Sequence, residues 1–539
     1  MTETARKPKV AYFCMEFGLH EDFKIYSGGL GILAGDILKA ARDENLPMIG
    51  VGILWRQGYT RQLIDKNGMP YDCYHEYRYD FLKDTGVTVT VKIRGKNVTC
   101  KVWLCDKYDN VPLYLLDTNI PGNNGNLLTG QLYGWFAEER VAQEIILSIG
   151  GMKALKALGL DVDIYHFNDS HPVLAGIELI RQKMDEKGMD FEEAWAQTRE
   201  QIIFTTHTPV EAGNEMHEHE LLRYMGAYDG LTYGQMVKIG GEPFSMTVAG
   251  LRLSRKANAV AKLHGETARK MWKEVTGASE IIAVTNGVHN GTWQDGRVYK
   301  AYAGNADILI PHLEAKREMV EEIYSRNGIR LDENILTIGF ARRAAPYKRS
   351  DLIFKKREFI EPLLKNKKLQ IIFSGKSHPN DLIGKKIVSN IYKMSELYPE
   401  SVVFLQDYDM KIGKLLTRGC DIWLNNPIRP MEASGTSGMK AAMNGVLNLS
   451  VLDGWWPEGC IHGINGWQIG DGYEGPDHEK VDGDSLCSVL SKEVIPTFYN
   501  DKSKWREMMR ASIKMSTWEF SAARMVQEYY SLMYMNEEI

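Results

Sequence analysis

Several features are missing from this sequence, and each absence narrows the class of protein. The 539 residues contain no apolar run of about 20 residues, so the sequence predicts no membrane-spanning helix. The first residues, MTETARKPKVAYF, have no apolar run of signal-peptide length, and we therefore expect a cytoplasmic location. The formal net charge is -5, so we expect no general electrostatic attraction to nucleic acid or to anionic membranes.

Cysteine is also scarce. The sequence has 7 cysteines, an odd number with irregular spacing, and none of them forms a CxxC pair. This pattern argues against a disulfide framework or a zinc knuckle and favours reduced thiols. We therefore expect no metal site. Internal repeats, low-complexity tracts and long linkers are missing as well, which indicates an ordinary globular chain.

What is present is an alternation of short apolar runs with longer amphipathic stretches. A length of 539 residues predicts two to four domains at ~100–200 residues each. Several runs are almost entirely apolar, as expected of parallel strands that are buried on both faces, and the alternation indicates a doubly wound α/β protein. The predicted strands are Val10–Cys14, Met48–Leu54, Ile202–Thr206, Ile281–Thr285, Leu336–Ala341, Leu369–Ser374, Val402–Leu405, Ile422–Leu424 and Val446–Val451.

One segment breaks this alternation. Val87–Leu104 has a period of two, and Arg94–Asn97 separates its halves, which predicts an antiparallel hairpin inserted into the first domain. The polar, glycine-containing segment Gly291–Asn334 is the best candidate for a domain boundary. The sequence thus predicts two α/β domains of similar size. In such sheets, ligands bind beyond the carboxyl ends of the strands, so the residues there are the first candidates for a site.

Glycine, histidine and asparagine follow several of the predicted strands. Tyr26–Asp36 (YSGGLGILAGD) precedes a helical pattern, where glycines allow a backbone to approach an anion closely. A tight turn built for packing explains this weak signal equally well. His171 and His207 also lie near strand ends, but a lone histidine is more often a structural hydrogen-bonding residue than a catalytic one. Asn286 precedes a glycine, and a turn alone accounts for that dipeptide.

A basic cluster follows the predicted strand Leu336–Ala341. Four basic residues lie within the eight residues of Arg342–Arg349, although the protein is acidic overall. Arginine forks and a lysine suit a phosphate dianion, whereas the alternative is a solvated charged face. We favour a phosphate site, because a proline and a tyrosine interrupt the run and it follows a strand.

The segment Glu432–Gly445 (EASGTSGMKAAMNG) combines a small-residue loop, hydroxyl groups and the start of a helix. Such a segment offers backbone N–H and hydroxyl donors to an anion. Lys440 lies in the first turns of the helix, where its amine can form a Schiff base with an aldehyde cofactor. Composition alone favours an exposed surface lysine instead.

Six ordered segments resemble those of the glycogen/α-glucan phosphorylase family. EASGTSGMKAAMNGVLNLSVLDG is similar to the motif of the lysine that carries pyridoxal 5'-phosphate (PLP), and YSGGLGILAGD resembles the glycine-rich phosphate loop. The further segments are FNDSHPVLAGIEL, FTTHTPVEAGNE, VTNGVHNGTW and the basic run from Arg343 to Arg349. Together they extend from about Tyr12 to Asp453, and the compact length is similar to that of the short bacterial and archaeal members.

The resemblance implies a glycosyltransferase-B arrangement, in which two Rossmann-like doubly wound α/β domains face a central cleft. We expect an N-terminal domain at residues 1–300 with the inserted hairpin, and a C-terminal domain at residues 301–510 with the PLP lysine. A helix at residues 511–539 is expected to cross back to the first domain.

The resemblance also implies roles for individual residues. The catalytic set is Gly29, His207, Arg343 and Lys348. Of these, Gly29, Arg343 and Lys348 are expected around the cofactor phosphate and the substrate phosphate. The cofactor-binding set is Gly29, Trp293, Tyr347, Lys348, Thr436, Gly438 and Lys440, of which Lys440 carries PLP. The substrate-binding set is Asp169, His207, Asn286, Glu432, Ser434 and Gly435, and His171 is expected to be buried near the same cleft.

In this family, phosphate reversibly cleaves the terminal α-1,4-linked glucose of maltodextrin, glycogen or starch and gives α-D-glucose 1-phosphate with retention. The phosphate of PLP acts as a proton shuttle. The implied partners are inorganic phosphate and an α-1,4-glucan, and relatives commonly form homodimers. Two phosphates in close approach repel each other, which explains the basic residues Arg343 and Lys348.

The sequence departs from the family's segments at two places, and three alternative functions remain. The cofactor loop reads Thr-Ser-Gly-Met-Lys where the animal enzymes have Thr-Gly-Asn-Met-Lys, and Ala344–Pro346 replaces a histidine-containing tripeptide of a gating loop, so we expect an enzyme without that gate. A nucleotide-sugar glycosyltransferase of the glycogen/starch synthase type would share the fold but would not need Lys440. A decayed glucan-binding scaffold would have lost such charged residues, and an unrelated PLP transaminase would make the ordered segments a coincidence.

Overall fold

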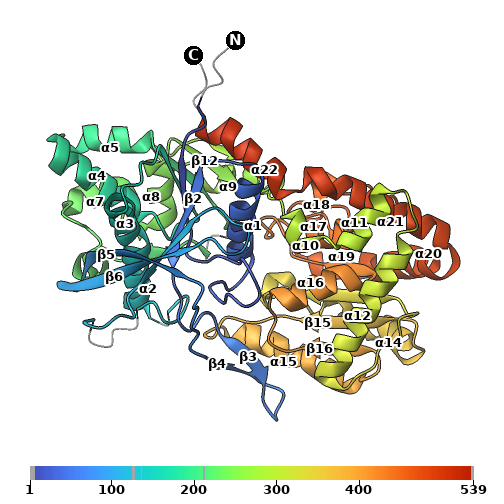
Figure 1. The fold of residues 1–539 in the computed structure, drawn as a ribbon. Coiled ribbons are helices and arrows are strands. Elements are labelled where there is room, and N and C mark those ends of the chain that lie inside the picture. Colours follow the sequence, from blue (N-terminus) through green and yellow to red (C-terminus); the bar gives the residue numbers. More distant parts are fainter. Residues whose placement is uncertain (1–5, 124–127, 135, 211–212, 536–539) are drawn as a thin grey trace. The chain divides into compact units, whose positions relative to one another are not determined.

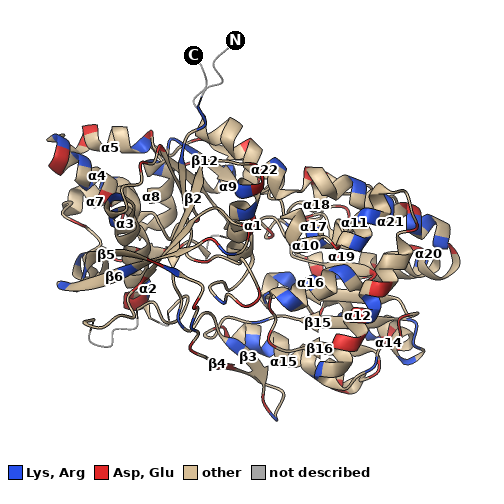
Figure 2. Ribbon diagram, viewed as in Figure 1, with Lys and Arg blue, Asp and Glu red and all other residues tan. Residues whose placement is uncertain are grey.

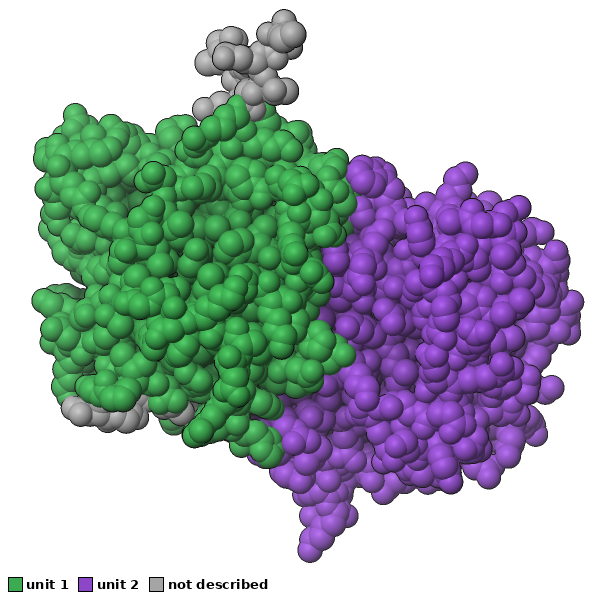
Figure 3. All heavy atoms as spheres, in the orientation of Figure 1, with its two compact units in different colours: residues 1–59, 74–285, 522–539 green, residues 60–73, 286–521 purple. Residues whose placement is uncertain are grey.

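The chain forms two compact units, each built around its own sheet (Figure 3). The computed structural model describes residues 6–123, 128–134, 136–210 and 213–535. Unit 1 comprises residues 1–59, 74–285 and 522–539, and unit 2 comprises residues 60–73 and 286–521. Each predicted apolar run contains a strand or lies within one, and parallel sheets with many helices make this an α/β protein.

The sheet of unit 1 has the strand order β13-β12-β9-β8-β1-β2-β7-β6-β5. The strands from β13 to β7 are parallel, and β6 and β5 join as an antiparallel hairpin, as the period-two segment predicts. The bounds are β1 (Val10–Phe13), β2 (Met48–Ile53), β5 (Lys83–Ile93), β6 (Lys96–Cys105), β7 (Leu113–Asp117), β8 (Ile164–Asn168), β9 (Ile202–Thr205), β12 (Lys256–Ala259) and β13 (Ile281–Ala283).

Helices and a small second sheet complete unit 1 (Figure 1). Two of the helices, α2 and α3, are joined by a π-helical turn at Ile146–Gly150. The bounds are α1 (Gly29–Asp43), α2 (Ala137–Ile145), α3 (Gly151–Ala157), α4 (Leu174–Lys187), α5 (Phe191–Arg199), β10 (Met216–His217), α6 (His219–Met225), α7 (Tyr233–Gly240), β11 (Phe244–Ser245), α8 (Met246–Leu253), α9 (Lys262–Trp272) and α22 (Ala522–Glu528).

The last helical segment belongs to unit 1, although it comes from the far end of the chain. α22 packs on α1, and the π-helical segment Tyr529–Tyr534 follows it. The Tyr534 hydroxyl lies 2.5 Å from Nδ1 of the buried His166, and Nδ2 of Asn258 donates to the Tyr529 hydroxyl at 3.0 Å. These tyrosines are nearly fully buried, so the C-terminal segment is part of the core of unit 1.

The sheet of unit 2 is entirely parallel, with the order β16-β15-β14-β17-β18-β19. Numbered within the sheet this is 3-2-1-4-5-6, the order of a Rossmann fold, which reverses direction between its first and fourth strands. The bounds are β14 (Thr337–Ala341), β15 (Gln370–Ser374), β16 (Val402–Leu405), β17 (Ile422–Asn425), β18 (Leu447–Val451) and β19 (Gly466–Ile469).

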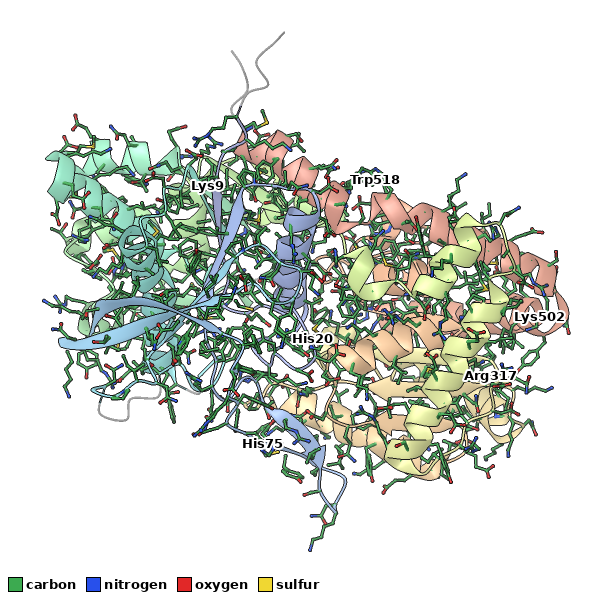
Figure 4. All side chains as sticks on the ribbon, viewed as in Figure 1. Lys9, His20, His75, Arg317, Lys502 and Trp518 are labelled. Carbon is green, nitrogen blue, oxygen red and sulfur yellow. The ribbon has the colours of Figure 1, made fainter. Side chains whose placement is uncertain are left out.

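Acidic and basic residues are scattered over the helices of unit 2 and of unit 1 (Figure 2). In Figure 4 the labelled Lys502 and Trp518 mark the two ends of α21. No helix within the described residues is long and apolar enough to cross a membrane. The bounds are α10 (Asn290–Trp293), α11 (Gly296–Ala303), α12 (Leu309–Asn327), α13 (Leu352–Lys355), α14 (Arg357–Lys365), α15 (Leu382–Leu397), α16 (Met410–Gly419), α17 (Ser437–Ala442), α18 (Trp456–Gly459), α19 (His478–Val489), α20 (Ile495–Asn500) and α21 (Lys502–Glu519).

A hairpin from the N-terminal half of the sequence also belongs to unit 2. It consists of β3 (Arg61–Ile64) and β4 (Pro70–Cys73). Gln62 Nε2 donates to the Ser377 carbonyl at 3.2 Å and Gln62 Oε1 accepts from the Ser377 N–H at 2.9 Å, while Arg61 pairs with Asp407 at 3.0 Å.

The division into units therefore differs from the expected domains in three places. Residues 60–73 were expected in the N-terminal domain, but their hydrogen-bond partners lie in unit 2. The main boundary falls between Thr285 and Asn286 rather than at residue 300, and the return to unit 1 begins at Ala522 rather than at residue 511.

Candidate active site

The strongest candidate site in unit 2 lies where the strand order reverses. β14 and β17 are neighbours there, and polar residues follow both strands. Asn425 is the last residue of β17, and its Oδ1 accepts a 2.5 Å hydrogen bond from Nη1 of Arg342, the first residue after β14. Open α/β sheets bind ligands at this reversal, so the topology selects the same segments as the sequence motifs.

Three charged side chains meet at this point. Glu432 Oε2 accepts a hydrogen bond from Lys348 Nζ at 2.5 Å and another from Arg342 Nη2 at 2.8 Å. Lys348 and Glu432 are each 7% exposed, so these interactions are charge-assisted and poorly screened by water. When Lys348 is protonated, the cluster carries one more positive than negative charge and is therefore suited to an anion.

Burial and neighbouring charges change the proton affinity of this cluster. Burial, together with the nearby guanidinium of Arg342, lowers the pKa of Lys348 to about 7. Burial alone raises the pKa of Glu432, but the positive charges of Arg342 and Lys348 outweigh it and hold this pKa at about 2. An added anion would favour the protonated form of Lys348, because an opposite charge raises the pKa of an ammonium group.

Lys440 lies on α17 and is buried, with 6% of its surface exposed. Its Nζ is 3.6 Å from the centroid of the Trp293 ring, a cation–π contact. The Trp293 carbonyl accepts hydrogen bonds from Nδ2 of Asn444 and Nε of Arg418 at 3.0 and 3.1 Å, which fixes the backbone that carries the ring. The structure thus holds a buried amine against a flat aromatic surface.

The loop before α17 is built from small residues that pack tightly. Gly435 has a φ of 82°, a left-handed conformation that favours glycine. A Cβ at Gly438 would lie 2.6 Å from Oδ1 of Asn448, so the helix approaches β18 too closely for a side chain there. Thr436 is the N-cap residue of α17. Within the described residues, the buried hydroxyl of Ser434 has no hydrogen-bond partner.

In unit 1, the strand order reverses between β1 and β8, and Asp169 directly follows β8. Asp169 has a φ of 69°, which is uncommon for a residue other than glycine, and its N–H donates to the Thr205 carbonyl at 2.9 Å. Burial raises the pKa of Asp169 to about 6 and lowers that of His171 to about 3. The strained backbone of Asp169 and the shifted pKa values of Asp169 and His171 together mark this strand end as a candidate functional position.

His207 follows β9, the neighbour of β8. Its Nε2 lies 2.6 Å from Oδ1 of Asn168, whose Nδ2 donates to the sulfur of Cys14 at 3.3 Å. In this arrangement Nε2 of His207 carries the proton and Nδ1 can act as an acceptor. Burial lowers the pKa of His207 to about 3, so the ring is neutral at physiological pH.

Glu16 organises the glycine-rich turn. Its carboxylate accepts hydrogen bonds from the N–H groups of Ser27 and Gly28 at 2.5 and 3.0 Å, and from the Tyr133 hydroxyl at 2.6 Å. α1 then begins at Gly29, and a Cβ added there would meet no atom within 4 Å. The backbone at Gly29 is therefore open to a close approach by another group.

A second buried charge cluster in unit 1 has the composition of a metal site. Ligand atoms of Glu144, Glu215 and His217 lie within 4.8 Å of one another. However, Arg140 Nε donates to Glu215 Oε1 at 2.9 Å, and His217 Nε2 lies 3.1 Å from Glu144 Oε2. Because Arg140 already supplies the positive charge, we assign this cluster as an ion-pair network.

The structure brings several of the predicted site residues together. Lys348 meets Glu432, with its Nζ also 4.6 Å from the centroid of the Tyr347 ring, and Lys440 meets Trp293. In unit 1, residues at the ends of β8 and β9 are joined through Asn168. Asn286 was expected with the N-terminal domain but is the first residue of the second segment of unit 2.

Other residues occupy positions that the sequence analysis did not assign. Arg343 is exposed, whereas the unassigned Arg342 reaches Glu432. Arg343 acts through space, where its charge helps to lower the pKa of Lys348. Asn425 and Asn168 are further residues without an expected role. Both end parallel strands next to a reversal of strand order, and that position was the available signal.

Known proteins support this reading of the motifs. The family described as carbohydrate phosphorylase matches residues 141–227 and 307–456. Maltodextrin phosphorylase of Thermococcus litoralis is 39% identical over 97% of this chain and 70% of its own length. Glycogen phosphorylase of Aquifex aeolicus is 35% identical over 99% of this chain and 87% of its own. Glycogen phosphorylase of Mycobacterium tuberculosis is 35% identical over 96% of this chain and 70% of its own length. The chain therefore belongs to the carbohydrate phosphorylase family.

Proposed function

We propose that the protein is an α-glucan phosphorylase that transfers the terminal α-1,4-linked glucose of maltodextrin, glycogen or starch to inorganic phosphate. The product would be α-D-glucose 1-phosphate, formed reversibly and with retention. The observation that carries the proposal is the buried Arg342–Lys348–Glu432 cluster at the reversal of strand order, which has an excess positive charge when Lys348 is protonated. The names of the maltodextrin and glycogen phosphorylase relatives support the substrate class.

The residues of unit 2 fit the cofactor PLP. Lys440 provides a buried amine, and Trp293 provides a flat surface beside it. Within the described part of the chain, the buried Nε of Arg342 and Oγ of Ser434 have no hydrogen-bond partner, and both can donate to a phosphate oxygen. When bound, PLP would supply a phosphate group that exchanges a proton with the substrate phosphate. We propose that Lys440 holds the cofactor, with Gly29, Trp293, Tyr347, Lys348, Thr436 and Gly438 around it.

The basic residues have an electrostatic task in this reaction. Two unit negative charges about 5 Å apart repel each other by about 3 kcal/mol at an effective dielectric constant near 20. We propose that Lys348, Arg342 and Arg343 offset this repulsion when the substrate phosphate binds. With a pKa of about 7 before an anion arrives, Lys348 can gain its proton as phosphate enters, so that a buried cation forms together with its counter-ion.

We propose the sugar-binding residues from the same resemblance. Glu432, an anion that can accept hydrogen bonds, would hold glucose hydroxyls together with Ser434 and Gly435. His207 would accept a hydrogen bond from a sugar hydroxyl at Nδ1, because its Nε2 is hydrogen-bonded to Asn168. Asp169 and Asn286 complete the proposed set.

Two further proposals, on location and on oligomeric state, accompany the function. We propose a cytoplasmic location, because all 7 cysteines are free, which fits the reducing environment there. A homodimer remains an expectation from the resemblance.

Borohydride reduction followed by peptide mapping tests the proposal. Protein prepared with PLP should carry one pyridoxyl phosphate group on Lys440 and should convert glucose 1-phosphate, but not ADP-glucose, into longer glucan. An unmodified Lys440 together with turnover of ADP-glucose would replace the proposal with a nucleotide-sugar transferase. Lys414, a lysine on α16 of the same unit, serves as the internal control for nonspecific modification.

A further inference from the structure

The loop that carries Glu432 is fastened to the segment that follows β18. Asp453 Oδ2 accepts a hydrogen bond from the backbone N–H of Glu432 at 2.9 Å, and Asp453 Oδ1 accepts one from Gly454 at 2.8 Å. The Ser434 carbonyl accepts a hydrogen bond from the N–H of Trp455, also at 2.9 Å. Asp453 is only 3% exposed, so its carboxyl group serves these backbone donors rather than solvent.

Gly454 brings the two segments into direct contact. Its φ is 58°, in the left-handed region, and a Cβ there would lie 2.3 Å from the Ser434 carbonyl oxygen. No side chain fits at that distance, so only glycine allows this approach. The loop is thus held at two points, Glu432 and Ser434, against the segment that follows β18.

We propose that Asp453 is a positioning residue that fixes the backbone of Glu432 and thereby directs its carboxylate towards Lys348 and Arg342. This inference rests on the proposed function, in which Glu432 and Ser434 bind the glucose unit. A shift of the loop would separate Glu432 from both cations, whose distances to it are 2.5 and 2.8 Å. Catalytic geometry is sensitive to displacements of about 1 Å, so a loosened loop should lower the rate.

The surroundings of Asp453 add a dependence on pH. Burial, and then the negative charge of Glu432, raise the pKa of Asp453 to about 7, against the lowering effect of Arg429 and of the two backbone donors. Asp453 also helps to raise the pKa of the neighbouring Tyr347. Protonation removes the negative charge that attracts the N–H of Glu432, so the hold on the loop weakens below neutral pH.

The variant Asp453→Asn tests the inference, because an amide presents an NH2 group to one of the two backbone donors. We expect amide hydrogen exchange in peptides that contain Glu432 to be at least tenfold faster than in the wild type. We also expect kcat/KM for glucose 1-phosphate to fall at least tenfold, with unchanged PLP content, and the acid limb of the rate near pH 7 to disappear. Asp501→Asn is the matched control: Asp501 accepts a backbone N–H from Lys504 at 3.0 Å at the start of α21.

The outcomes separate the two proposals. Wild-type exchange at Glu432 together with wild-type kinetics in Asp453→Asn would overturn the positioning role. If the wild-type protein lacks phosphorolysis, the proposed function fails, but hydrogen exchange still decides whether Asp453 holds the loop. If thermal melting shows that Asp453→Asn does not fold, Gly454→Ala decides instead, because it keeps the carboxyl group and places a methyl group against Ser434. Faster exchange at Glu432 is then expected, and unchanged exchange would refute the contact.

Discussion

Replacing Lys348 by alanine tests the charge cluster directly. The ammonium group is held 2.5 Å from Glu432 Oε2 and is nearly buried, so it is preorganised where we propose that phosphate binds. Losing one preorganised contact that stabilises developing charge costs about 2.7–4 kcal/mol of transition-state stabilisation. We therefore expect kcat/KM for phosphate to fall about 100- to 1,000-fold.

The same change should have a much smaller effect on folding. Breaking a buried ion pair costs about 3–5 kcal/mol when it leaves a buried charge without a partner. Here Glu432 keeps Arg342 at 2.8 Å, so we expect only the loss of one charge-assisted hydrogen bond, about 1.5–3 kcal/mol. Part of that loss is offset, because burial already disfavours the charged form of Lys348 and lowers its pKa. The variant should therefore remain folded at room temperature.

The assay is phosphate-dependent release of glucose 1-phosphate from maltodextrin, with the PLP content of each sample measured in parallel. Lys385→Ala is the matched control, because Lys385 pairs with Asp72 at 2.5 Å in the same unit and has no proposed role in the reaction. Urea unfolding of both variants separates lost activity from lost stability. Activity of Lys348→Ala within threefold of the wild type would refute the assignment of the cluster to phosphate.

Three further perturbations concern separate parts of the molecule. Asn168→Asp places a carboxylate against His207, so the pKa of His207 should rise from about 3. The KM for glucose 1-phosphate should then increase more at pH 6 than at pH 8. Unchanged ¹⁵N chemical shifts of the His207 ring would contradict the hydrogen bond. Tyr534→Phe removes the hydroxyl partner of Nδ1 of the buried His166 and should lower the free energy of urea unfolding by about 1–3 kcal/mol, with kcat unchanged. Equal stability of variant and wild type would show that this hydrogen bond contributes nothing. The folded pKa of Glu432, about 2, lies below the ordinary value of 4.5, so this residue stabilises the fold by about 3 kcal/mol above pH 4.5 and loses that contribution as the pH falls towards 2. In urea unfolding between pH 5 and 3, Glu432→Gln should therefore lose less stability than the wild type, and parallel curves would argue against the shift.

Sequence reasoning finds the strands of this fold because burial on both faces leaves a continuous apolar run. The segments Val402–Leu405 and Leu369–Ser374 are such runs, and both contain strands of the parallel sheet of unit 2. β12, with the sequence KANA, lacks this signal, because only four residues cross the sheet and one of them is the buried Asn258. Its place depends on partners in β9 and β13, which no local pattern encodes.

The site is predictable to the level of segments but not of atoms. Motifs locate the basic run and the lysine that we propose holds PLP, and the structure adds the contacts that choose among neighbours. Arg342 rather than Arg343 reaches Glu432, because the residue that directly follows β14 lies beside Asn425 at the end of β17. The sequence does not distinguish these two neighbouring arginines, but in an extended segment adjacent side chains point in different directions.

The positions at which the chain passes between the units have a consequence for biosynthesis. The polypeptide changes unit after residues 59, 73, 285 and 521, so neither unit is one continuous stretch. The core of unit 1 includes Tyr529, Tyr530 and Tyr534, which are translated after the whole of segment 286–521 of unit 2. Domains generally complete their folding in order from the N-terminus as synthesis proceeds. Here the unit that is started first must wait until α22 and Tyr529–Tyr534 have left the ribosome, and a nascent chain arrested before Ala522 would expose an incomplete core to chaperones.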